Sequence, residues 1–281
     1  MPIQKLVGVD DRAADEIGEL KSQFLASLSY EIRTPLTGIL GNLDLLLETD
    51  LSSDQREYAL DSHLSAQNVL LVINATLEYS ALMANQVALE EAEFDLRGTM
   101  ADLTGEFSPQ GSAKGLVLIE NVDPDLPQVV IGDEFRIRQL LAYLITNAIK
   151  YTSQGEVEVC ARVLAKDEQR LSVSVSVRDT GIGIPPGHLD AIFQPFRQSE
   201  SGPTRRYSGM GLGLALSQQL ARLMGSEVRV VSAVGQGSTF SVDLSLGVPR
   251  EPALSIIRKP RTAESPQAPE TQPVLQEAIA V

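Results

Sequence analysis

The sequence predicts a chain in two parts, an α-helical dimerisation hairpin followed by an α/β sandwich. Apolar residues recur at steps of three and four through roughly the first 85 residues, a period typical of long helices. Beyond residue 87 the pattern changes to the alternation typical of strands, and strand-like and helix-like stretches follow one another to residue 247. A hydrophobic content of 43% in 281 residues supports a core for both parts. The net charge of −14 argues against a nucleic acid partner, whose phosphates would repel the chain.

Two helices account for the first part. The first begins at about Ala14 and carries a long apolar stripe, made of Ile17, Leu20, Phe24, Leu28, Ile32, Leu36, Ile39, Leu43 and Leu47. Pro35 cannot donate a backbone hydrogen bond, so we expect a bend just after Tyr30. Residues 50–54 predict a turn, and a second helix follows over about 55–85. The residues suited to cap it are Ser52, Ser53 and Asp54, and its apolar face holds Leu60, Leu64, Leu71, Ala75 and Leu82. Because two such helices cannot bury their apolar faces alone, we expect a homodimeric four-helix bundle.

The second part reads as helices packed on one face of a mixed sheet. Strands are expected at 87–96, 115–120, 157–164, 171–178, 228–232 and 239–246, and helices at 96–108, 133–152 and 208–224. Residues 249–281 contain six prolines and few large apolar residues, which predicts a disordered tail. No apolar run approaches the 18 residues or so of a membrane span, and the first residues lack the apolar segment of a signal peptide. A cytoplasmic location is therefore expected, with any membrane tether lying upstream.

A run of eighteen residues in the first helix carries the first functional signal. Residues 24–41 read FLASLSYEIRTPLTGILG. With histidine in place of Tyr30, this run resembles the histidine box of the bacterial two-component sensor kinases. The chain is most similar to their tyrosine-bearing alphaproteobacterial homologues, known as DivL. The resemblance implies that Tyr30 stands at the phosphoacceptor position, and that Glu31 and Thr34 match the acid/base residue and the residue that positions a phosphatase water.

Residues 132–155 resemble the N box of the ATP-binding domain in the same family. The resemblance implies that Asn147 binds the Mg²⁺ that bridges the phosphates, that Lys150 faces the phosphates, and that Tyr151 lies against the nucleotide. These three residues share one face of a helix, because they are three and four residues apart. Many family members carry a second asparagine where this chain has Tyr143, which is expected to weaken Mg²⁺ binding and catalysis.

Two glycine-bearing boxes complete the resemblance. Residues 179–185, DTGIGIP, resemble the G1 box, and residues 209–216, GMGLGLAL, resemble the G2 box. The G1 resemblance implies that Asp179 accepts from the adenine amino group, while Gly181 and Gly183 let the backbone approach the base. The G2 glycines would wrap the phosphates at a helix N-terminus, where N–H groups favour anions. These glycines are Gly209, Gly211 and Gly213.

Between these boxes the sequence predicts a lid over the nucleotide. Phe193 and Phe196 resemble the F box at the base of the lid, and the lid itself covers residues 198–208. Arg205 and Arg206 within it could reach a γ-phosphate.

The resemblance implies four segments and a fold of the Bergerat or GHKL type. The segments are a linker from an upstream signalling region (1–13), a dimerisation and phosphotransfer-like (DHp) domain (14–87), a HATPase_c-like domain (88–248) and the tail (249–281). The implied ligands are ATP or ADP with Mg²⁺. The implied partners are a second copy of the chain, a receiver-domain response regulator docked on the bundle below Tyr30 at about residues 37–47, and another sensor kinase.

The tyrosine changes the expected mechanism. A neutral imidazole, with a pKa near 6.5, is a nucleophile at neutral pH, whereas a phenol with a pKa near 10 needs a base. We therefore expect an atypical kinase homologue that binds a response regulator and modulates a partner kinase, with reduced or absent phosphotransfer. Two alternatives stay open, an ATP-dependent autokinase that uses Tyr30, and an ordinary histidine kinase engineered from histidine to tyrosine. Tyr143 favours a natural lineage over a single designed change, because it is a second departure.

Overall fold

The computed structural model describes residues 31–197 and 211–249. The chain divides into two compact units, with the boundary between Ala88 and Leu89. We call them the hairpin unit and the sandwich unit, and describe each by itself. Tyr30, the expected linker at 1–13, the whole of the expected lid (198–208) and the expected tail beyond residue 249 lie outside the described residues.

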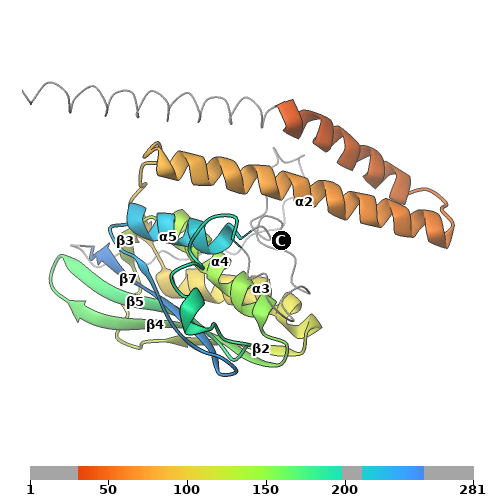
Figure 1. Cartoon of the computed structure of the whole chain (residues 1–281). Coiled ribbons are helices and arrows are strands. Elements are labelled where there is room, and N and C mark those ends of the chain that lie inside the picture. Colours follow the sequence, from red (N-terminus) through yellow and green to blue (C-terminus); the bar gives the residue numbers. More distant parts are fainter. Residues whose placement is uncertain (1–30, 198–210, 250–281) are drawn as a thin grey trace, which may run out of the picture. The chain divides into compact units, whose positions relative to one another are not determined.

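The hairpin unit contains two antiparallel helices, residues 31–47 and α2 (Ser53–Met83) (Figure 1). Ser52 caps α2 with a capping box: its hydroxyl accepts from the Gln55 N–H, and the Gln55 side chain accepts from the Ser52 N–H. Two polar contacts join the helices. Arg33 donates to Asn74 Oδ1 at 2.8 Å, and His63 Nε2 lies 2.9 Å from Asp44 Oδ1. The predicted turn and second helix are therefore confirmed.

The first helix turns a stripe of half-buried apolar residues away from solvent: Ile32, Leu36, Leu40, Leu43 and Leu47. Four of these residues, Ile32, Leu36, Leu43 and Leu47, belong to the predicted apolar stripe, so the stripe is confirmed at those positions. Ile39 was also predicted to belong to it, and that expectation is wrong: Ile39 is exposed, as are Leu45 and Leu46. On α2, Leu60 and Leu64 are also exposed, whereas Ala59 and Ala66 are buried. The hairpin thus carries apolar surface on more than the face that its two helices share.

A seven-stranded mixed sheet forms the base of the sandwich unit (Figure 1). Its strands run in the order β1-β3-β7-β5-β4-β2, with β6 paired to β7. Only the β2–β4 pair is parallel among the described strands. The strands are β1 (Ala92–Phe94), β2 (Leu116–Val122), β3 (Val130–Gly132), β4 (Gly155–Lys166), β5 (Arg170–Asp179), β6 (Val228–Ala233) and β7 (Gly237–Gly247).

Three helices cover one face of this sheet: α3 (Leu96–Ala113), α4 (Glu134–Tyr151) and α5 (Gly213–Leu223) (Figure 1). A short 3-10 turn, η1, spans Pro186–His188. Alternate strand residues point into the core beneath the helices and are fully buried, for example Val157, Val159 and Ala161 of β4 and Leu171, Val173, Val175 and Val177 of β5. None of the described helices is long and apolar enough to cross a bilayer. The predicted sandwich is confirmed.

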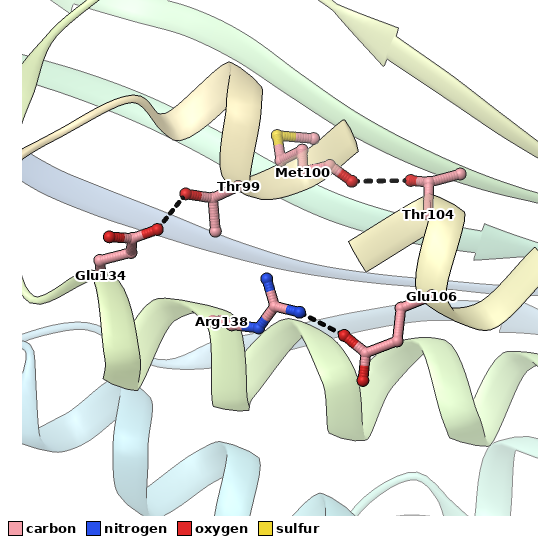
Figure 2. Close-up of polar contacts among 6 residues, drawn as sticks. All are labelled: Thr99, Met100, Thr104, Glu106, Glu134 and Arg138. Carbon is pink, nitrogen blue, oxygen red and sulfur yellow. Dashed lines mark hydrogen bonds and ion pairs between the residues drawn. The ribbon is translucent and has the colours of Figure 1, made fainter. Parts of the chain in front are cut away.

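Polar contacts join α3 to α4 above the core (Figure 2). Thr99 Oγ1 donates to Glu134 Oε1 at 2.8 Å, and Arg138 forms an ion pair with Glu106. Within α3, Thr104 Oγ1 also donates to the Met100 carbonyl. These contacts fix α4, which carries the predicted N box.

Several expected boundaries are wrong for identifiable reasons. The first strand covers only Ala92–Phe94, because Asp95 already caps α3 and the partner strand β3 has three residues. Helix α3 continues through Pro109 to Ala113, five residues beyond its expected end, because its last turn packs tightly on the sheet. A Cβ on Gly111 would lie 2.4 Å from Leu118 Cδ1.

The last helix starts later than the expected residue 208. Gly211 has a φ of +69°, which an α-helix excludes, and the helix begins at Gly213. Strand β3 was not predicted, because its three residues are too few for a detectable alternation.

Candidate nucleotide-binding site

Asp179 is the most enclosed of the predicted site residues. It ends β5, between Val157 of β4 and Ser238 of β7, and only 5% of it is exposed. Its Oδ1 accepts a hydrogen bond from the Gly181 N–H at 2.8 Å. Burial raises the pKa of Asp179, and hydrogen bonds from the backbone of Gly181 and Ser238 partly oppose that rise. The result is a buried, oriented carboxylate at the end of a central strand.

The two G1 glycines are required by close backbone contacts. A Cβ on Gly181 would lie 2.4 Å from the Tyr151 carbonyl oxygen. Gly183 has a φ of +67°, and a Cβ there would lie 2.0 Å from the Ala233 carbonyl oxygen. The loop after Asp179 is therefore pressed between the end of α4 and the end of β6.

These contacts bring the predicted G1 and N boxes together. The Ile182 N–H donates to the Tyr151 carbonyl at 3.3 Å, so the loop touches the last residue of α4. Asn147, Lys150 and Tyr151 are all half-buried in the last turns of that helix. The contact between Ile182 and Tyr151 thus joins the loop that follows Asp179 to the helix that carries the N-box residues.

Lys150 sits in a partly desolvated environment. Burial lowers its pKa, and the neighbouring charge of Lys114 lowers it further. Its Nζ lies 5.5 Å from the centre of the Tyr151 ring. An anion beside Lys150 would offset the cost of burying its charge, which suits the predicted contact with phosphate.

Lys114 was not predicted. Its Nζ donates to the carbonyls of Ile149 and Lys150 at 3.0 and 3.4 Å, and so satisfies the end of the N-box helix. Sequence gave no signal for it, because Lys114 follows α3 and lies 35 residues before its partner Ile149.

Tyr143 lies inside the site. It is buried, with 7% exposed, and its Cδ1 would lie 3.8 Å from a Cβ on Gly213, the first residue of α5. Tyr143, which the resemblance places where many family members carry a second asparagine, is therefore packed against the predicted G2 box, at the helix N-terminus expected to receive phosphates.

The two ends of the predicted lid meet. The Phe196 N–H donates to the Gly211 carbonyl at 3.2 Å, and a Cβ on Gly211 would lie 2.4 Å from the Arg197 carbonyl oxygen. The residues on the two sides of the segment 198–210 thus lie next to each other. Arg205, Arg206 and Gly209 lie within that segment, outside the described residues.

The F-box phenylalanines differ in their surroundings. Phe196 has a φ of +61° and is exposed. Phe193 is half-buried and lines a pocket of about 440 Å³ between the segment after η1, helix α5 and strand β6. The other lining residues are Leu189, Asp190, Gln218, Gln219, Arg222, Val228 and Val230, none of which was predicted as a site residue.

Glu31 and Thr34 belong to the hairpin unit. Both are exposed, and their spacing of three residues places them on one side of the helix. Tyr30, the residue they follow, lies outside the described residues. Their predicted roles stay predictions.

The chain matches two protein families. Residues 20–85 match the His Kinase A (phospho-acceptor) domain, HisKA, and residues 132–248 match the histidine kinase-, DNA gyrase B-, and HSP90-like ATPase family, HATPase_c. The first match lies within the range predicted for the dimerisation domain (14–87), and the second within the range predicted for the ATP-binding domain (88–248).

Curated relatives and a solved structure agree with these two family matches. The chain is 38% identical over 235 residues to the signal transduction histidine-protein kinase BarA of Escherichia coli (strain K12), covering 84% of this chain and 26% of BarA. It is 39% identical over 240 residues to the sensor protein GacS of Pseudomonas syringae pv. syringae, covering 85% and 26%. The crystal structure of full-length ShkA in complex with AMPPNP matches with a TM-score of 0.70 and 34% identity, over 81% of this chain and 46% of ShkA.

The chain is therefore a two-component histidine kinase core, with a HisKA helical hairpin followed by a HATPase_c sandwich. It spans about a quarter of the length of BarA and GacS. Tyr30, which the resemblance to the histidine box places at the phosphoacceptor position, falls within the residues that match HisKA.

Proposed function

We propose that this chain is an atypical, DivL-like kinase homologue that binds a response regulator and modulates a partner kinase instead of relaying phosphate. The observation that carries the proposal is Tyr30. A histidine kinase core with both domains present has a phenol where the family has an imidazole.

The chemistry of the two acceptors supports this proposal. A phenol is mostly protonated at neutral pH and needs a base, a role for which Glu31 is the nearest candidate. A phenyl phosphate ester is also far less reactive than a phosphohistidine, so transfer to a receiver aspartate would be unfavourable. The relay is thus obstructed at both of its steps, while the surfaces for partners are unaffected.

Nucleotide binding belongs to the proposal. The sandwich unit binds ATP or ADP, with Asp179 accepting from the adenine amino group and Asn147 holding Mg²⁺. The buried carboxylate beside a glycine loop and the desolvated Lys150 fit a base and a phosphate. The AMPPNP bound to the related ShkA supports the same conclusion. Because Tyr143 stands where many family members have an asparagine, the phosphate side of the site lacks one amide. Mg²⁺ binding is therefore weaker than in relatives with a second asparagine.

The hairpin unit supplies the partner surfaces. It forms a homodimer through a four-helix bundle, because its helices expose apolar side chains outside the face that they share. A receiver domain docks on residues 37–47, where Ile39, Leu45 and Leu46 are exposed.

Receiver binding is expected to survive Tyr30→Phe and to fail in Leu45→Asp. The phenol hydroxyl is not needed if no phosphoryl group is transferred, whereas Leu45 is 65% exposed and a charge there removes an apolar contact. Binding of purified receiver domains, with and without beryllofluoride, should be measured by calorimetry. We expect a loss of about tenfold or more for Leu45→Asp, as for an interface anchor.

The matched control is Leu164→Asp, which changes an exposed leucine on β4, in the other unit. Circular dichroism and light scattering check that each variant is folded and dimeric. The docking proposal is wrong if Tyr30→Phe loses the receiver, or if Leu45→Asp retains it.

The second candidate is an ATP-dependent autokinase that phosphorylates Tyr30. It is favoured by the retained Asp179 and N-box residues, which a chain without any use for nucleotide would not need. An engineered His→Tyr variant of an ordinary kinase would also retain them, but it leaves Tyr143 without an explanation.

A further inference from the structure

We propose that Ser232 is a positioning residue for the nucleotide base: its hydroxyl holds the loop that follows Asp179 in the conformation that recognises adenine. The inference rests on the proposed binding of ATP or ADP to the sandwich unit. It concerns a residue on β6, 53 positions after Asp179, outside all of the boxes that the sequence resembles.

The Ser232 hydroxyl lies within hydrogen-bonding distance of three partners. Its Oγ accepts a hydrogen bond from the Ile184 N–H at 2.8 Å. It lies 3.0 Å from the Gly237 carbonyl oxygen, to which it donates, and 2.9 Å from Ser238 Oγ. A hydroxyl has one proton and two lone pairs, so donation to Gly237 leaves it able to accept from both Ile184 and Ser238.

Three hydrogen bonds hold the loop at residues 182–184. The Ile182 N–H donates to the Tyr151 carbonyl at 3.3 Å, and the Ile182 carbonyl accepts from the Gly235 N–H at 2.8 Å. The third is the bond from Ile184 to Ser232. Of these three, only the last uses a side chain, so it is the one that a substitution removes cleanly.

The same hydroxyl also supports the other side of Asp179. Ser238 is the register partner of Asp179 across β5 and β7, and its backbone N–H hydrogen-bonds to the Asp179 carboxylate. A Cβ on Gly237 would lie 1.9 Å from the Asp179 carbonyl oxygen, so the turn before β7 presses directly on Asp179. Ser232 therefore joins the G1 loop to two residues that lie against Asp179, Gly237 at its backbone carbonyl and Ser238 at its carboxylate.

This arrangement predicts a defect in base recognition more than in phosphate binding. The phosphate side of the site, at Lys150 and the start of α5, has no contact with Ser232 among the bonds described. Loosening the loop should therefore weaken the binding of ATP more than the binding of inosine triphosphate. Inosine triphosphate lacks the 6-amino group from which Asp179 would accept a hydrogen bond.

The test measures dissociation constants for ATP and inosine triphosphate by calorimetry on the whole chain. Ser232→Ala should weaken ATP binding about tenfold, because it leaves the Ile184 N–H without its partner, and weaken inosine triphosphate binding by about twofold at most. Ser232→Thr keeps the hydroxyl and should remain close to wild type. The matched control is Ser172→Ala, a half-buried serine at the opposite end of β5 from Asp179.

The inference would be overturned if Ser232→Ala weakened the binding of both nucleotides equally. It would also be overturned if the variant lowered the unfolding temperature without changing the ratio of the two dissociation constants. Both results would leave the proposed nucleotide site intact. Failure of the wild-type chain to bind either nucleotide would overturn the proposed nucleotide site, and this inference with it. Hydrogen exchange of the wild-type chain tests the bond even if Ser232→Ala does not fold. The Ile184 amide should be protected, and exchange at the rate of an open loop would contradict the proposal.

Discussion

Asp179→Asn is expected to weaken ATP binding on the order of a hundredfold while leaving the sandwich unit folded. The substitution replaces a charged acceptor with an amide whose NH₂ group would face the amino group of adenine. Asp179 is buried and its Oδ1 is oriented by the Gly181 N–H, so no water can substitute easily for the lost interaction. Calorimetry with ATP and a thermal unfolding scan of the nucleotide-free protein measure the two effects separately.

The pH dependence of that variant provides an internal control. Burial raises the pKa of Asp179 above its ordinary value of 3.8, so the folded state holds the proton more tightly than the unfolded state. The stabilising effect of this proton is present at acidic pH and is lost as the pH rises through the raised pKa. Relative to wild type, Asp179→Asn should therefore be more stable at neutral pH, and this advantage should shrink on acidification. A variant that is less stable at pH 7 and still binds ATP normally would contradict this view of the site.

Restoring the acceptor alone is expected to give a poor autokinase. Tyr30→His supplies the imidazole, but Tyr143 remains packed against the start of α5. The N-box resemblance implies that many family members carry an asparagine at this position. The double variant Tyr30→His, Tyr143→Asn should incorporate label from ATP at least about tenfold faster than Tyr30→His alone. This increase corresponds to an activation barrier lowered by roughly 1.4 kcal/mol.

The matched control for that gain is Tyr30→His with Tyr143→Phe, which keeps the ring and adds no amide. Thermal unfolding must accompany the assay, because replacing a buried ring with a small side chain leaves a cavity. Robust labelling by Tyr30→His alone would show that catalysis was blocked only at the acceptor.

The sequence predicted the elements with strong periodicity and missed those decided by packing. Helix α4 was expected at 133–152 and spans Glu134–Tyr151, because Asp133 caps it and its apolar residues from Ile137 to Ile149 are buried. Helix α3 was expected to end before Pro109, but the packing of Gly111 on Leu118 outweighs the lost hydrogen bond. The exposure of Ile39, which was expected on the apolar stripe, depends on how the helix is rotated against α2, and periodicity alone does not determine that rotation.

In the candidate site, too, the residues within local sequence motifs were predicted and those placed by long-range contacts were missed. The boxes named Asp179, Asn147 and the glycines because their resemblance is local in sequence. The hydrogen bond between Ser232 and Ile184 joins residues 48 positions apart, and the one between Lys114 and Ile149 joins residues 35 positions apart, so no local pattern marks either pair. Tyr143 was noticed as a departure, whereas its packing against Gly213 emerged only from the fold.

The central claim is that this kinase core binds nucleotide but does not relay phosphate through Tyr30. Incubation of the wild-type chain with ATP labelled at the γ-phosphate, followed by transfer to receiver domains, tests it most directly. The account predicts ATP binding, little or no label on the chain and none on the receiver. Acid-stable label on Tyr30 that disappears in Tyr30→Phe, together with loss of function in that variant, would contradict it and establish the tyrosine autokinase.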